Sequence, residues 1–65
     1  MDGEATKVLE VLTVEQPCSR IHLQGALGRT YPNRSWGERT VSRALQRLKY
    51  RSLVDYDVVW RTIDQ

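Results

Sequence analysis

The stretch from Ser35 to Lys49, SWGERTVSRALQRLK, carries cationic side chains at helical spacing. Its apolar positions follow the i, i+3, i+4, i+7 spacing of a helix that faces a core, and they are Val41, Ala44, Leu45 and Leu48. The opposite face then holds Trp36, Arg39, Arg43, Gln46, Arg47 and Tyr50. A solvated helix face usually mixes glutamates with its cations, whereas this stretch contains one acid, Glu38. Arginine forks and a glutamine amide bind phosphate oxygens and base edges, so this face predicts recognition of a polyanion.

The charge of the chain is segregated along the sequence. The net charge is only +2. Residues 18–53 nevertheless hold eight lysines and arginines against one glutamate, a local charge of +7, whereas residues 1–17 carry −3 and residues 54–65 carry −2. A basic segment between acidic flanks is the electrostatic footprint of nucleic-acid binding.

The length and composition limit the class of protein. A chain of 65 residues forms one small domain and has no room for two lobes with a cleft between them. It contains no run of about 18 apolar residues and no secretory leader pattern, which predicts a soluble cytoplasmic protein, nucleoid-associated in a prokaryotic or viral setting, with no membrane partner. Cys18 is the only cysteine, so neither an intramolecular disulfide nor a cysteine-based zinc site can form.

The remaining reactive residues do not form a catalytic pattern. Four serines share one histidine, His22, and no phosphate-cradling glycine motif occurs. The carboxylates of Asp55, Asp57 and Asp64 lack partner ligands at a metal-binding spacing. We therefore expect no enzyme activity, no catalytic residue, no metal, no cofactor and no small-molecule ligand. His22 is expected to be an exposed residue at a helix start, or to help that helix start hold a phosphate with Ser19 or Arg20.

Three helices are predicted, over residues 4–15, 22–28 and 36–50. The first has apolar residues at helical spacing, namely Ala5, Val8, Leu9 and Leu12, and Pro17 stops it. Gly28 is placed to end the second helix, after a short extended piece over residues 18–21. The third helix is expected to begin with a capping box formed by Ser35 and Glu38.

Residues 53–63 alternate between apolar and polar types, which is typical of β structure. A hairpin with a three-residue turn at residues 57–59 would pair Tyr56 with Trp60, Asp55 with Arg61, and Leu53 with Ile63. One longer continuous strand is the alternative, because no glycine or asparagine supplies the usual turn. We favour the hairpin, with Trp60 in the core and Tyr56 packed beside it.

The segment RTVSRALQRLKYRSLV (residues 39–54) resembles the recognition helix and following strand of winged helix-turn-helix DNA-binding domains, and HLQGALG (residues 22–28) resembles their second helix. The resemblance extends over residues 4–63. It implies an α+β fold, a three-helix winged helix-turn-helix with a short C-terminal β-hairpin as a minimal wing, in a single domain over residues 1–65. It departs from the usual pattern in its longer loop at residues 29–34, in Ser52 where glycine is common, and in an acidic wing that is not expected to touch DNA.

The resemblance implies that the helix over residues 36–50 enters the major groove of duplex DNA. The implied base-contacting residues are Arg39, Ser42, Arg43 and Gln46. The cations of the basic segment, which could neutralise phosphates, and the Tyr50 hydroxyl give the expected phosphate-contacting residues: Arg20, Arg29, Arg34, Arg47, Lys49, Arg51 and Tyr50. Trp36 either lies exposed at this interface or packs against the loop beside Tyr31 and Pro32, and Tyr50 either contacts phosphate or covers the β segment.

The expected function is that of a small transcriptional regulator that binds double-stranded DNA sequence-specifically. A homodimer is a further expected partner arrangement, through the first helix or an exposed edge of the β segment. Two alternatives stay open from the sequence: a winged-helix adaptor that binds proteins, and a domain that binds structured RNA.

Overall fold

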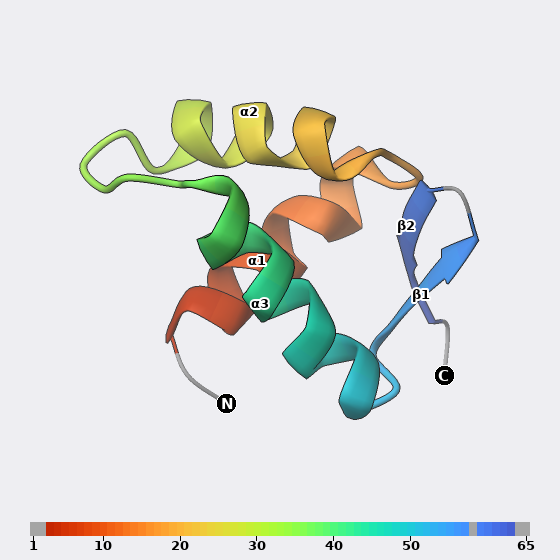
Figure 1. Ribbon diagram of the computed structural model, residues 1–65. Helices are drawn as coiled ribbons and strands as arrows, with labels where there is room; N and C mark the ends of the chain where they lie inside the picture. Colours follow the sequence, from red (N-terminus) through yellow and green to blue (C-terminus); the bar gives the residue numbers. More distant parts are fainter. Residues whose placement is uncertain (1–2, 58, 64–65) are drawn as a thin grey trace.

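A computed structural model places three helices before a two-stranded antiparallel hairpin (Figure 1). The elements are α1 (Gly3–Glu15), α2 (Arg20–Thr30), α3 (Glu38–Tyr50), β1 (Val54–Asp57) and β2 (Val59–Thr62). The structure describes residues 3–57 and 59–63. The order of elements confirms the predicted α+β class, and the arrangement is consistent with a minimal winged helix.

One hydrophobic core joins all the elements. In Figure 1, α2 crosses above α1 and α3, and the hairpin lies beside them; α1 packs against both other helices and against β2. The buried side chains are Ala5, Val8, Val11, Leu12, Cys18, Leu23, Ala26, Leu27, Trp36, Val41, Ala44, Leu45, Leu48, Val54 and Trp60. The predicted apolar face of α3 is therefore confirmed in full. On α1, Val11 is buried and Leu9 only partly so, because the buried side of that helix is turned toward Val11 and away from Leu9 relative to the predicted face.

α2 is longer than predicted at both ends. It begins at Arg20, where the Ser19 hydroxyl caps it by accepting a hydrogen bond from the His22 amide at 3.2 Å. It also continues through Gly28 to Thr30, so the prediction that Gly28 ends the helix is wrong. No described glycine has a positive φ, and burial of the preceding Leu27 holds the last turn in helical geometry.

α3 begins two residues later than predicted. Gly37 is its N-cap and provides no side-chain hydrogen bond, so the capping box of Ser35 and Glu38 does not form. The reason is Trp36, whose side chain is buried and whose indole Nε1 donates to the Tyr31 carbonyl oxygen at 3.2 Å. Anchoring this indole in the loop holds the chain extended at Gly37, with ψ at 164°, before the helix can start.

The hairpin has the predicted register. Tyr56 lies opposite Trp60 and Asp55 opposite Arg61 in the antiparallel pair, and the Ile63 amide donates to the Leu53 carbonyl at 2.9 Å. The predicted three-residue turn at residues 57–59 includes residue 58, which lies outside the described residues.

A third chain segment extends this small sheet. Cys18 pairs with Trp60 through two backbone hydrogen bonds of 3.1 and 2.7 Å, so it covers the side of β2 that faces away from β1. The predicted extended piece over residues 18–21 is therefore confirmed for Cys18 and Ser19. It is wrong for Arg20 and Ile21, which are helical. The Gln16 side chain adds to the same edge by accepting from the Thr62 amide at 2.7 Å.

The end of α3 adopts a left-handed turn at a serine. The Leu53 amide donates to Leu48 and the Ser52 amide to Lys49, each at 3.0 Å, which is the hydrogen-bond pattern of a Schellman motif. Ser52 has a φ of 60° at the position where glycine normally stands. The absence of glycine there therefore leaves the helix exit unchanged and places a side chain in a strained conformation.

Candidate nucleic-acid interface

α3 presents one face to the core and the other to solvent. We define its outer face as Arg39, Arg43, Gln46, Arg47, Lys49 and Tyr50, all of which are exposed. Ser42, the fourth residue predicted to contact bases, is half-buried at the margin of this face. Because the opposite side of α3 is fixed by buried Val41 and Leu45, the outer face is held on a rigid support. A helix of this kind has the diameter that the major groove of DNA admits.

The electrostatics of the outer face are unbalanced. Arg39 and Arg43 are four residues apart, and like charges at this spacing destabilise a helix by about 0.2–0.5 kcal/mol. Among the residues that the structure describes, no acid forms an ion pair with Arg39, Arg43 or Lys49. An anion lying along α3 would relieve this repulsion, whereas solvent alone only screens it.

Two arginines predicted to contact phosphate are instead engaged within the protein. Arg34 Nη2 lies 3.1 Å from the Glu4 carboxylate, and its guanidinium stacks on the Trp36 ring at 4.8 Å. Arg20 is half-buried, and its Nη1 donates to the Gln24 amide oxygen at 2.6 Å. Arg29 and Arg51 are exposed and form no ion pair with any described acid. The predicted phosphate-binding set therefore divides into arginines with internal partners and arginines that face solvent.

The two aromatic residues assigned to α3 have opposite environments. Trp36 is only 7% exposed, and its ring centroid lies 6.2 Å from that of Tyr31, so the structure places it in the loop packing and not on the outer face. The prediction that Trp36 lies exposed at the interface is therefore wrong, because Trp36 precedes α3 and packs beside Tyr31. Tyr50 is 88% exposed and does not cover the β segment.

The acidic residues of α1 are directed toward α2 and the following loop. Glu10 accepts from the Tyr31 hydroxyl at 2.7 Å, and this hydrogen bond raises the pKa of Tyr31 above its ordinary value. Glu15 contacts His22 Nε2 at 2.9 Å, so the exposed His22 is held against α1. These contacts engage Glu10 and Glu15 with the loop and with α2, whereas Glu4, at the start of α1, lines a small hollow together with Arg43 and Arg47 of α3.

The hairpin carries little available positive charge. Arg61 is the only cation among the residues of β1 and β2, and its Nη2 lies 3.6 Å from the Asp55 carboxylate across the strand pair. The pair has a net charge of zero. The hairpin therefore differs from a basic wing in the charge that it presents.

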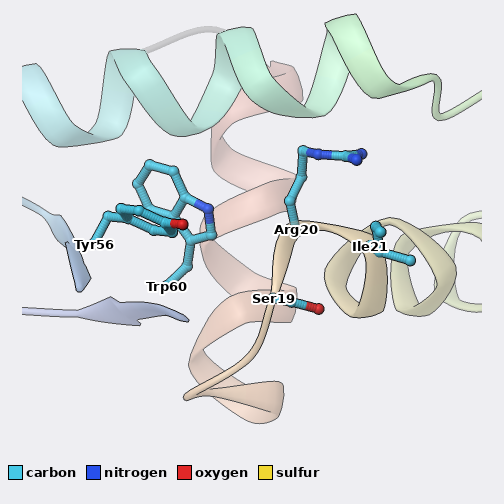
Figure 2. A pocket seen from close by; sticks show the side chains of 5 residues that line it. All are labelled: Ser19, Arg20, Ile21, Tyr56 and Trp60. Atoms are coloured by element: carbon cyan, nitrogen blue, oxygen red, sulfur yellow. The ribbon is translucent and has the colours of Figure 1, made fainter. Parts of the chain in front are cut away.

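A shallow hollow of about 300 Å³ lies between the start of α2 and the hairpin. Figure 2 shows its lining residues, which are Ser19, Arg20, Ile21, Tyr56 and Trp60. The two aromatic rings pack with centroids 4.7 Å apart, as predicted, and Trp60 is buried. Ile21 is 72% exposed, and its exposure was not predicted from the sequence. The signal for it was available, because Leu23 and Leu27 define the buried side of α2 and Ile21 falls on the other side.

The described residues contain no cluster of three His, Cys, Asp or Glu side chains that could hold a metal ion. None of the described helices has the length and apolar character that a membrane crossing requires. The Cys18 side chain is buried, and its pKa is raised above the ordinary value by desolvation and then by the nearby charge of Glu15.

The fold and this surface define a small α+β domain with an exposed basic helix. Comparisons with protein-family models, with curated proteins and with solved structures give no match.

Proposed function

We propose that this protein is a winged helix-turn-helix domain that binds duplex DNA sequence-specifically, with α3 in the major groove, and acts as a small transcriptional regulator. The observation that carries the proposal is the outer face of α3. It places Arg39 and Arg43 in solvent without acidic partners among the described residues, on a helix whose other face is buried. An α-helix anchored in this way and rich in arginine is suited to the major groove.

The exposed positions suggest distinct roles along the helix. Arg39 and Arg43 are the candidates for guanine O6 and N7, and Gln46 for adenine, because their side chains can form bidentate pairs with those edges. Ser42 is half-buried and would contribute through a short contact only. Phosphate contacts would come chiefly from Arg29, Arg47, Lys49, Tyr50 and Arg51. Arg20 and Arg34 would have to exchange their internal partners to join them.

A homodimer would let two copies of α3 reach neighbouring half-sites. The free edge of β1 is a poor dimer face. The Trp60 backbone forms its hydrogen bonds with Cys18, on the side of β2 away from β1. Tyr56, which lies opposite Trp60 in β1, therefore directs its backbone amide toward the free edge of β1, where it donates to the Asp55 carboxylate at 2.9 Å. α1 is the better candidate, since Val14 is 80% exposed there.

A second candidate function, docking of a protein partner, is favoured by the hollow beside α2. Ile21 and Tyr56 expose apolar surface around it, and exposed apolar patches often mark protein interfaces. Such an adaptor would bind nucleic acid weakly and without sequence preference.

Selection from a randomised duplex library at two salt concentrations tests the proposal. We expect one site to be enriched, and Arg43→Ala to relax the preference at one position by about 1–3 kcal/mol. Arg29→Ala should weaken binding to all duplexes alike and lower the salt slope by about one. Arg61→Ala removes the same charge from a pair on the hairpin and serves as the control.

Weak binding that disappears with salt and enriches no site would contradict DNA recognition and favour the adaptor. Preference for an A-form RNA competitor over duplex DNA would instead favour an RNA-binding role. Equal loss at every sequence in Arg43→Ala would contradict base readout by that residue.

A further inference from the structure

Glu38 is the first residue of α3, where its negative charge interacts favourably with the helix N-terminus. It does not cap the helix, since Gly37 is the N-cap and no side-chain cap hydrogen bond forms. Its side chain is 75% exposed. The N-terminal end of α3, which the proposed function places against the base edges, therefore carries a negative charge.

The only ion pair of Glu38 with a described residue is a loose one. Arg20 Nη2 lies 3.9 Å from Glu38 Oε1, which is beyond hydrogen-bond length. Figure 2 shows the Arg20 side chain extending from the start of α2 toward α3, away from the aromatic pair of the hollow. Its Nη1 is already bound to Gln24 at 2.6 Å. The Glu38 carboxylate therefore has the capacity to accept hydrogen bonds from an incoming ligand.

A carboxylate approaching DNA is repelled by the phosphates unless a donor on a base edge compensates it. In the major groove, guanine presents two acceptors to such a group, and adenine presents its amino donor beside the N7 acceptor. Cytosine presents its N4 amino donor, and a glutamate can accept from it. Cytosine is therefore the base whose edge suits an isolated carboxylate best.

We propose that Glu38 is a specificity-determining residue of the DNA interface, whose carboxylate accepts a hydrogen bond from the N4 amino group of a cytosine. This assignment rests on the proposed function, because it requires α3 to lie in the major groove. Glu38 then selects one cytosine next to the bases that Arg39 and Arg43 contact, and disfavours other bases there through repulsion.

The test is selection from a randomised duplex library with the wild-type chain and with Glu38→Gln. A glutamine amide pairs with adenine N6 and N7, so we expect one position to change from cytosine to adenine, with a change in preference of about tenfold or more. The remaining positions of the site should be unchanged. Glu10→Gln is the matched control, since it makes the same change in charge on α1 and can still accept from the Tyr31 hydroxyl.

The outcomes separate the two proposals. If Glu38→Gln and Glu10→Gln both strengthen binding to all duplexes and leave every preference unchanged, the assignment of Glu38 is wrong while DNA binding stands. A wild-type site without a cytosine that responds to Glu38 would likewise overturn the assignment alone. If the wild-type chain enriches no site at all, the proposed function itself fails and the assignment fails with it.

Discussion

Trp36 allows a direct test of whether an aromatic residue beside the basic helix supports the fold or touches a ligand. The side chain is 7% exposed, packs on the Tyr31 ring, and donates one hydrogen bond to the Tyr31 carbonyl. Replacing a buried tryptophan with alanine costs about 3–5 kcal/mol. A chain of 65 residues has a total stability of about 3–10 kcal/mol, so Trp36→Ala is expected to unfold much of the protein.

Trp36→Phe is the informative variant because it keeps an aromatic ring in the core. It removes the Nε1 donor and leaves the Tyr31 carbonyl to find water, at a cost of about 1 kcal/mol for the hydrogen bond alone. For a domain of this size, that loss lowers the melting temperature by about 4–8 °C. Far-UV circular dichroism during urea and thermal unfolding measures it without depending on tryptophan fluorescence.

Binding measured on the same variant separates the two roles of this residue. Below its melting transition, Trp36→Phe should bind duplex DNA within about twofold of the wild-type affinity, since the ring is covered by the loop. A variant with wild-type stability and DNA affinity reduced tenfold, about 1.4 kcal/mol, would refute the packing argument and return Trp36 to the interface.

Three further predictions concern stability. Gly28→Ala should raise the free energy of unfolding by about 1 kcal/mol in urea titrations, because Gly28 is helical with open space around its Cβ position; a loss would mean that Gly28 ends α2 after all. Ser52→Gly should exceed Ser52→Ala in stability by about 1 kcal/mol, since both lose the hydroxyl and only alanine retains the strain at φ 60°; equal stabilities would contradict a left-handed Ser52. The raised pKa of Cys18 means that the folded state holds the thiol proton more tightly than the unfolded state does. The stability that this contributes is present below about pH 9, and it should be lost as the pH rises from the pKa of the unfolded thiol toward the higher pKa of the folded thiol. Cys18→Ala should flatten the fall in urea midpoint above about pH 9, and an unchanged fall would exclude the thiol as its cause.

The elements that could be predicted from sequence are those with strong local periodicity. The apolar stripe of α3 specifies its buried face because residues three and four apart must share one side of a helix. The alternation after Leu53, together with the chemistry of the Tyr56–Trp60 and Asp55–Arg61 pairs, specifies the hairpin register. In both cases the signal lies within about a dozen residues.

The C-terminal ends of α1 and α3 were predicted correctly, but both ends of α2 and the start of α3 were not, because these depend on packing that the local helix signals do not contain. Gly28 is a stop signal by local chemistry, yet burial of Leu27 against the other helices carries α2 past it. The capping signal of Ser35 is likewise overridden, since the Trp36 indole is held by the Tyr31 carbonyl and the helix starts after it. Local propensity amounts to about 1 kcal/mol at such positions, and burying one large side chain outweighs it.

The exposed face of α3 could be predicted from the sequence, whereas the internal contacts that occupy some of the neighbouring cations could not. Counting charges along the sequence treats every cation of the central segment as available, but folding brings Arg34 to Glu4, thirty positions away in the sequence. The acids of the first segment are also directed toward α2 and its loop through Tyr31 and His22. Glu4 is the exception, because it lines a small hollow with Arg43 and Arg47, so the separation of charge along the chain is only partly kept in space. The positive charge without described acidic partners is concentrated on α3, so the surface offered to a polyanion is smaller and more one-sided than the sequence alone indicates.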